Sequence, residues 1–227
     1  MSWISDALTS SIGRKLSMSL TGLFLVSFLF VHLSGNFLLF KADNGDAFNL
    51  YSHFMSTAGI IRVLELVLVA GFGLHIYTAI VLTRKNAAAR PVEYVANGSN
   101  KKVTWFSKNM GLSGSIVLVF LLLHLQNFYW RYHNWDIPMV EIDGKEYKDM
   151  YFLVASVFKN EWWVNPVYLL GLLLLGFHLQ HGFASAFNTL GLEHKKYSPI
   201  ISRIGNLISV LIPLGFATMP LYFWLFN

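Results

Sequence analysis

The sequence contains no cysteine, and this absence excludes several kinds of site. Disulfides, cysteine-ligated zinc and iron–sulfur clusters all need cysteine sulfur, so any cluster that serves this protein must belong to another chain. Charged residues are also scarce: they make up 13% of the 227 residues, against roughly a quarter in soluble proteins. Because 55% of the residues are hydrophobic, the composition indicates an integral membrane protein with little room for a soluble domain.

Basic residues outnumber acidic ones, 17 to 12, and the formal charge of +5 invites comparison with nucleic-acid-binding proteins. However, the basic residues form short clusters between long apolar runs and give no continuous basic face. We therefore expect membrane lipid and protein partners, and no nucleic-acid partner.

Five apolar runs are long enough to cross a bilayer, since about 20 helical residues span the hydrocarbon core. They cover residues 18–40, 60–83, 110–130, 166–188 and 204–226. None alternates apolar and polar residues as barrel strands do, and the first is too long for the apolar part of a cleaved signal peptide. The sequence therefore predicts an all-α membrane protein in which residues 1–227 form a single membrane domain, a five-transmembrane-helix bundle.

The distribution of basic residues predicts the orientation of the bundle, because cytoplasmic flanks are enriched in Lys and Arg. With a cytoplasmic amino terminus, that side holds most of them: Arg14, Lys15, Arg84, Lys85, Arg90, Lys101, Lys102, Lys108, Lys195, Lys196 and Arg203. Most acidic residues then lie on the other side, many of them in the long outer loop 131–165. We expect an N-in/C-out, multi-pass protein.

Two parts of the outer loop carry local structural signals. The Asp143-Gly144 dipeptide suits a tight hairpin turn. Residues 150–158 are apolar but too few to cross a membrane, so we expect an interfacial helix or a flap on the outer surface.

Five of the eight histidines lie inside the predicted spans: His32, His75, His124, His178 and His181. A histidine in hydrocarbon either marks a site or makes an interhelical hydrogen bond. At 1.5 Å per residue, His32 and His124 lie about 21 Å from the cytoplasmic ends of their helices. His75 and His178 lie about 12 to 15 Å from those ends. Four of the histidines therefore form two layers.

Each layer contains one histidine from each of two non-adjacent helices, as bis-histidine ligation of a haem b requires. A single zinc or copper ion would need three or four ligands in one layer, and neither layer supplies them. The sequence thus predicts two haems b in the bundle interior. His32 and His124 are the expected ligands of an outer haem iron. His75 and His178 are the expected ligands of an inner haem iron.

Small residues at helical spacing are expected to leave room for the porphyrins, although glycine also serves close packing in membrane helices. They lie one or two turns from three of the four ligands, at Gly35, Asn36, Gly71, Gly171 and Gly182. The last two share a face with His178. We therefore prefer His178 to His181 as the inner-haem ligand and interpret His181 as a hydrogen-bond partner of a propionate or of a neighbouring helix.

Several blocks of the sequence are similar to one known family. They are Ser11-Ile12-Gly13-Arg14-Lys15 followed by Thr21-Gly22, then His32-Leu33-Ser34-Gly35-Asn36, and His178-x-x-x-Gly182. Together with the four-histidine layout, which covers nearly the whole chain, they resemble the dihaem cytochrome b membrane-anchor subunit of succinate dehydrogenases and fumarate reductases. The similarity is greatest to the single-chain, five-helix type of Bacteroidetes-like bacteria.

The resemblance implies a subunit of a succinate:quinone oxidoreductase or of a quinol:fumarate reductase in a bacterial inner (cytoplasmic) membrane. On the cytoplasmic side this subunit would bind an iron–sulfur subunit and a flavoprotein subunit. Those partners hold the clusters, the FAD and the dicarboxylate chemistry of the tricarboxylic acid cycle. Electrons would pass between the clusters, the two haems and a quinone, expected to be menaquinone, and a dimer of the whole complex is one expected form.

Other residues are candidates for cofactor contacts. Ser19 and Trp105, at the cytoplasmic ends of the first and third helices, are within reach of inner-haem propionates, but a helix-start serine and an interfacial tryptophan explain them equally well. Arg62 and Glu65 form either a simple salt bridge, a propionate contact or part of a quinone and proton site. In members of this family with an outer quinol site, an acidic residue lies well before the haem ligand of the second membrane helix. Asp46 fits that offset from His75 better than Glu65 does.

Two other functions remain open at this stage. A dihaem cytochrome b of a formate dehydrogenase or hydrogenase would share the bis-histidine helices but usually has another helix count. A haem-free transporter would need inverted repeats, and the sequence shows no repeat.

Overall fold

The computed structural model of the protein describes residues 10–88 and 110–226. Five of its helices are long and apolar enough to cross a membrane: Ser11–Phe40, Gly59–Ala88, Met110–Asn134, Val164–Thr189 and Ser198–Leu225. Each overlaps one predicted run. The prediction of an all-α, multi-pass membrane protein is therefore confirmed. Most helices continue past the apolar run because polar turns and caps extend beyond the hydrocarbon core.

The elements follow one another in a simple order along the chain. They are α2 (Ser11–Asn36), η1 (Phe37–Phe40), α3 (Asp46–Thr57), α4 (Gly59–Ala88), α6 (Met110–His124), η2 (Leu125–Trp130), α7 (Arg131–Asn134), β1 (Met139–Ile142), β2 (Lys145–Lys148), α8 (Met150–Asn160), α9 (Val164–Thr189) and α10 (Ser198–Leu225). Ser10 caps the first of these, since its hydroxyl accepts a hydrogen bond from the Gly13 N–H at 2.9 Å.

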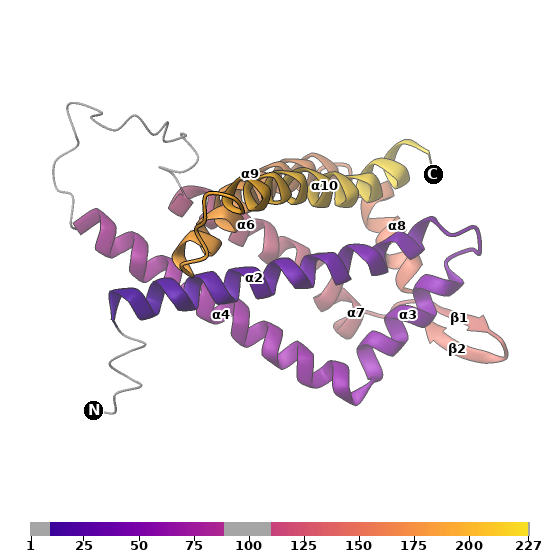
Figure 1. Cartoon of the computed structure of the whole chain (residues 1–227). Coiled ribbons are helices and arrows are strands. Elements are labelled where there is room, and N and C mark those ends of the chain that lie inside the picture. The colour runs from indigo at the N-terminus through magenta and orange to yellow at the C-terminus, as the bar shows by residue number, and fades with distance from the viewer. Residues whose placement is uncertain (1–9, 89–109, 227) are drawn as a thin grey trace.

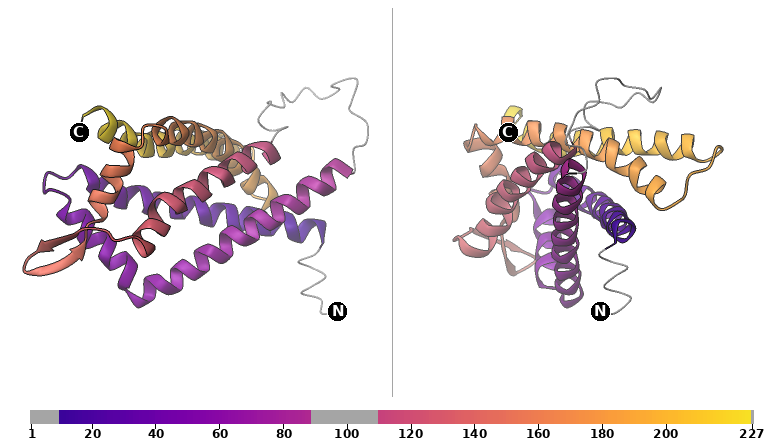
Figure 2. Two further views of the ribbon diagram at one scale, coloured as in Figure 1. Left: turned by 180° about the vertical axis from the view of Figure 1, so that it is seen from behind. Right: turned by 90° about the vertical axis from the view of Figure 1, so that its left-hand side faces the viewer.

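Four of the long helices form a ring. Helix α2 packs against α4 and α9, and α6 packs against α9 and, over a shorter stretch, against α4. The two diagonals of the ring are therefore α2 with α6 and α4 with α9. Helix α10 lies outside the ring against α9 and α2, as the two views of Figure 2 also show. This ring is the frame that positions the histidines.

The two ends of the bundle differ (Figure 1). Helix α2 begins at one end, here called the amino-terminal end, and the strands lie at the other, here called the hairpin end. The chain passes along the bundle five times, so α10, the last of the five long helices, ends at the hairpin end (Figure 1).

The predicted hairpin turn is present. Strands β1 and β2 pair antiparallel, with Ile142 opposite Lys145. The two residues between them, Asp143 and Gly144, both have positive φ, 51° and 73°. A two-residue type I′ turn requires this conformation, and its twist matches that of the strands.

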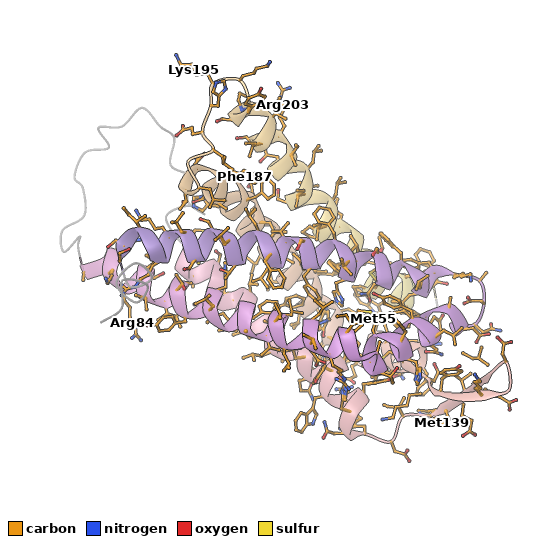
Figure 3. All side chains as sticks on the ribbon, turned by 60° about the horizontal axis from the view of Figure 1, so that its bottom comes forward. Met55, Arg84, Met139, Phe187, Lys195 and Arg203 are labelled. Carbon is orange, nitrogen blue, oxygen red and sulfur yellow. The ribbon has the colours of Figure 1, made fainter. Side chains whose placement is uncertain are left out.

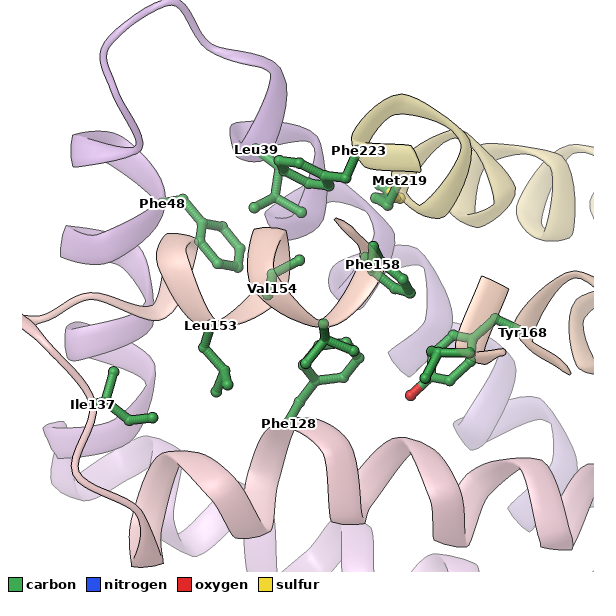
Figure 4. Packing of buried hydrophobic residues seen from close by; sticks show 12 residues of the cluster. Leu39, Phe48, Phe128, Ile137, Leu153, Val154, Phe158, Tyr168, Met219 and Phe223 are labelled. Carbon is green, nitrogen blue, oxygen red and sulfur yellow. The ribbon is translucent and has the colours of Figure 1, made fainter. Parts of the chain in front are cut away.

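Residues 150–158 form a helix, α8, but this helix is more deeply packed than an interfacial flap. Leu153, Val154, Val157 and Phe158 are buried. In Figure 4 they meet residues from η1, α3, η2, α9 and α10, among them Leu39, Phe48, Phe128, Tyr168 and Phe223. Helix α8 is thus the central element of a cap that closes the hairpin end, and burial of its apolar side stabilises the cap.

The third span changes its helical form part-way along. After His124 the chain continues as a π-helix over Leu125–Trp130 and returns to α-helix at Arg131. Short π-helical turns inside α-helices often occur at functional sites. Here the turn follows directly after one of the predicted ligands.

Candidate functional site

The structure brings the four predicted ligands together in two pairs, each across a diagonal of the ring. His32 on α2 faces His124 on α6, with ring centroids 5.7 Å apart and an interplanar angle of 87°. His75 on α4 faces His178 on α9, with centroids 6.3 Å apart and an angle of 70°. Each pair is named below by its two residues.

The two pairs lie at different heights in the bundle. The ring of His75 lies beside Gly22 of α2, which precedes His32 by ten residues. The ring of His178 lies beside Gly114 of α6, which precedes His124 by ten residues. At 1.5 Å per residue, both helices place the two pairs about 15 Å apart. The His32–His124 pair is the one nearer the hairpin end.

Each pair brings two imidazole rings from non-adjacent helices within 6.3 Å of each other in the bundle interior. The two rings of a pair would hold one haem iron, which would supply one-electron transfer. In addition, Nδ1 of His178 is buried and has no hydrogen-bond partner among the described residues.

Aromatic rings surround the His32–His124 pair. Phe28 stacks on His32 at 5.3 Å and 15°, and Phe216 approaches the same ring at 5.4 Å. The neighbours of His124 are Phe120, Phe128 and Tyr168, at 6.2, 5.2 and 6.1 Å. Such a shell excludes water from this pair and lowers the local dielectric constant.

Smaller residues flank the His75–His178 pair. Oγ1 of Thr21 lies 3.1 Å from Nδ1 of His75. A Cβ placed on Gly22 would lie 3.4 Å from Cε1 of His75, and one on Gly114 would lie 3.6 Å from Cε1 of His178. These glycines therefore keep the backbones of α2 and α6 close to the two rings. In the sequence, Thr21 and Gly22 carried only the family resemblance, and Gly114 was not singled out. Thr21 lies 11 residues, or three turns, before His32, and this spacing could have placed Thr21 on the same face of the helix as His32.

Three of the glycines are packed closely against aromatic rings, which favours the close-packing alternative for them. A Cβ on Gly35, Gly71 or Gly171 would lie within 3.0 Å of the rings of Tyr51, Phe24 and Phe120 respectively. These positions are small because an aromatic side chain fills the space. Gly182 differs, since no heavy atom lies within 4 Å of its Cβ position.

The remaining cofactor candidates are less closely placed. His181 is half-buried and makes no ring contact or hydrogen bond within residues 10–88 and 110–226, whereas His178 faces His75. Ser19 is buried and its hydroxyl donates to the Lys15 carbonyl of its own helix at 2.9 Å. Trp105 lies outside the described residues, as do Arg90, Lys101, Lys102 and Lys108.

The three quinone-site candidates do not form one cluster. Arg62 donates to Glu65 at 2.8 Å near the start of α4. Asp46 begins α3, which has 12 residues and therefore about 18 Å of helix before α4 begins. Within the described part of the chain, its carboxylate has no hydrogen bond or ion pair. Asp46 is thus separate from the other two.

Two residues from the third span join the Arg62–Glu65 pair instead. The Tyr129 hydroxyl donates to the second carboxylate oxygen of Glu65 at 2.8 Å. The ring of His133 lies 4.4 Å from that of Tyr129, with Nδ1 2.8 Å from the Tyr129 carbonyl. Sequence reasoning missed these residues because nothing in the chain links positions 64 residues apart. The resulting group of titratable side chains lies near the hairpin end.

A second polar network runs from the hairpin end toward His124. The Arg131 guanidinium pairs with Glu161, including one contact of 3.1 Å, and donates to the side-chain Oδ1 of Asn127 at 3.4 Å. Asn127 donates to the Tyr168 hydroxyl at 3.1 Å, and Tyr168 contacts the His124 ring. Asn127 belongs to the π-helix η2, which turns it inward.

Comparisons with protein-family models, with curated proteins and with solved structures find no match to this chain. Within the described residues, no group of three or more His, Asp and Glu side chains is placed to hold a single metal ion. The functional argument therefore rests on the residues and their geometry.

Proposed function

We propose that this chain is the membrane-anchor cytochrome b subunit of a succinate:quinone oxidoreductase or a quinol:fumarate reductase. In this role it passes electrons between an iron–sulfur subunit and menaquinone through two bis-histidine haems b. The observation that supports the proposal most strongly is the pair of facing histidine rings on each diagonal of the ring of helices.

The four histidines are the proposed iron ligands: His32 with His124, and His75 with His178. A haem b supplies one-electron transfer at its iron. The protein fixes the four rings on rigid helices, and the phenylalanines around His32 and His124 exclude water there. Gly22 and Gly114 keep the neighbouring backbones from filling the space beside the other pair.

The amino-terminal end is the proposed docking side for the iron–sulfur and flavoprotein subunits, the latter carrying FAD. Arg84 lies there, near the end of α4. Lys195 lies in the connection from α9 to α10, and Arg203 lies in the second turn of α10 (Figure 3). Basic residues favour the cytoplasmic side of a membrane. The proposed orientation is therefore N-in/C-out, in the bacterial cytoplasmic membrane.

The proposed quinone site lies at the hairpin end, at Glu65, Arg62 and Tyr129. A quinone exchanges protons as well as electrons, and Glu65 is a carboxylate within the membrane whose two oxygens are oriented by hydrogen bonds. Tyr129 is 48% exposed on the outer surface of the bundle, which leaves the group open to a quinone from the lipid phase.

The proposal is tested by tagging the chain, purifying its complex from native membranes and adding dicarboxylates. Succinate should reduce the haems, and fumarate should reoxidise them, as followed by the visible spectrum. Mass spectrometry should identify a flavoprotein and an iron–sulfur protein in the same complex. Reduction by formate or hydrogen, with no response to succinate, would contradict the proposal and support another dihaem cytochrome b.

A further inference from the structure

Thr21 of α2 is a polar side chain that contacts the His75–His178 pair. Its Oγ1 lies 3.1 Å from Nδ1 of His75. The next residue, Gly22, brings the backbone of α2 against the same ring. Thr21 and His32 lie three turns apart on α2. This helix therefore places a hydroxyl beside the His75–His178 pair and contributes His32 to the other pair.

The direction of this hydrogen bond follows from the other contacts of the hydroxyl. A threonine hydroxyl has one hydrogen to donate. Oγ1 of Thr21 donates it to the Ser17 carbonyl at 2.7 Å, with the Met18 carbonyl at 3.2 Å beside it. The oxygen therefore presents a lone pair to His75, from which we infer that Nδ1 of His75 carries the hydrogen. The Met18 backbone carbonyl, which can only accept, also hydrogen-bonds the His75 ring and favours a hydrogen on it. In this tautomer the free lone pair of the imidazole lies on Nε2.

The other rings have no such acceptor in the described part of the chain. Nδ1 of His178 is buried without a partner. Nδ1 of His32 lies 3.5 Å from the Asn36 amide nitrogen, which donates to the His32 carbonyl at 2.7 Å and cannot accept a hydrogen from the ring. His124 is surrounded by aromatic rings. Among the four described rings, a side-chain acceptor at Nδ1 is thus particular to His75.

We propose that Thr21 is the positioning residue of His75: its hydroxyl accepts a hydrogen bond from Nδ1 and so holds Nε2 ready to bind a haem iron. This inference rests on the proposed haem-binding function. A hydrogen bond from the remote nitrogen also makes an axial imidazole a stronger electron donor. The reduction potential of the haem on His75 and His178 is therefore lower than it would be without Thr21.

The test replaces the hydroxyl with a methyl group in Thr21→Val, within the complete purified complex. The affinity for one haem should fall about 10- to 100-fold, the usual effect of removing a hydrogen-bond partner of a ligand. The reduction potential of the same haem should rise. The haem on His32 and His124 should keep its affinity, its potential and its low-spin EPR signal, and it serves as an internal reference. Redox titration of the visible spectrum and EPR measure both haems.

Two matched variants control the test. Thr21→Ser retains a hydroxyl and should behave as the wild type. Thr78→Val removes a buried hydroxyl that bonds the Leu74 carbonyl of its own helix at 2.6 Å, and it should leave both haems unchanged. If Thr21→Val does not accumulate, Thr21→Ala makes the same comparison.

The outcomes separate this inference from the proposed function. Two haems in the wild type with both unchanged in Thr21→Val would overturn the role of Thr21 alone. An equal shift in Thr78→Val would also overturn it, because any lost helix hydroxyl would then suffice. A wild-type complex without haem would overturn both the proposed function and this inference.

Discussion

At the scale of single residues, the imidazole rings differ in what surrounds them. His32 and His124 are enclosed by phenylalanines, whereas His75 and His178 lie among a hydroxyl and two glycines. Two haems held in such different surroundings should have different reduction potentials, since hydrogen bonding and exclusion of water both tune them. A difference in potential between two centres about 15 Å apart would give electron transfer a direction along the bundle.

The choice between His178 and His181 gives a prediction at this scale. His178→Ala should remove one of the two haems, because the ring of His75 loses its counterpart 6.3 Å away. His181→Ala should retain both haems and only shift one potential, because its ring faces no other histidine ring. Haem content per chain, measured as the pyridine complex, distinguishes the two variants. Loss of a haem in His181→Ala but not in His178→Ala would show that the other face of α9 carries the ligand.

At the scale of elements, α10 approaches α9 closely at Gly176. A Cβ on Gly176 of α9 would lie 2.9 Å from the Ser209 carbonyl oxygen of α10. That oxygen belongs to the backbone and cannot rotate away. Pro213 lies next to the same glycine. Close approach of this kind is a common way for small residues to join membrane helices.

Gly176→Ala should therefore destabilise the protein by about 1–3 kcal/mol, the usual cost of overpacking. Gly73→Ala on α4 is the matched control, because no heavy atom lies within 4 Å of its Cβ position. This second variant should be neutral or stabilising by up to about 1 kcal/mol, as alanine is favoured over glycine in helices. The midpoints of thermal unfolding in one detergent measure the difference. Equal midpoints for the two variants would contradict the close approach.

At the scale of the whole molecule, the two ends of the bundle differ in structure. The hairpin end is closed by the α8 cap and carries the Glu65–Arg62–Tyr129 group. The amino-terminal end is the proposed docking side of the soluble subunits. Electrons would therefore travel the length of the bundle between the two ends, past both histidine pairs.

The docking side gives a prediction based on the sequence. Lys101 and Lys102 belong to the basic segment between α4 and α6, and reversing both charges to Glu should loosen the attachment of the iron–sulfur subunit. The effect should grow as the salt concentration falls, because charge repulsion is then less screened. The control is Lys145→Glu at the tip of the hairpin, where the side chain is exposed at the opposite end. Co-purification at several salt concentrations measures attachment, and equal retention by both variants would count against this docking side.

Much of this architecture could be predicted from the sequence because it depends on the lengths of apolar runs and on the rise of a helix per residue. Apolar runs gave the spans, and the fixed rise of a helix placed His32 level with His124. The features that the sequence did not predict depend on the rotation of helices and on contacts between residues far apart in the chain. Gly71 shares a face with His75, but the side chain that fills its space comes from another helix. Likewise, no local pattern joins Tyr129 to Glu65 or buries α8 in the core.

The central claim, that the two histidine pairs hold two haems b, is tested most directly by haem quantitation with a reduced-minus-oxidised spectrum of the purified protein. The account predicts two haems per chain, both low-spin with two histidine ligands, and loss of one of them in His32→Ala or in His75→Ala. A ratio near one, a high-spin spectrum or a chain without haem would contradict it.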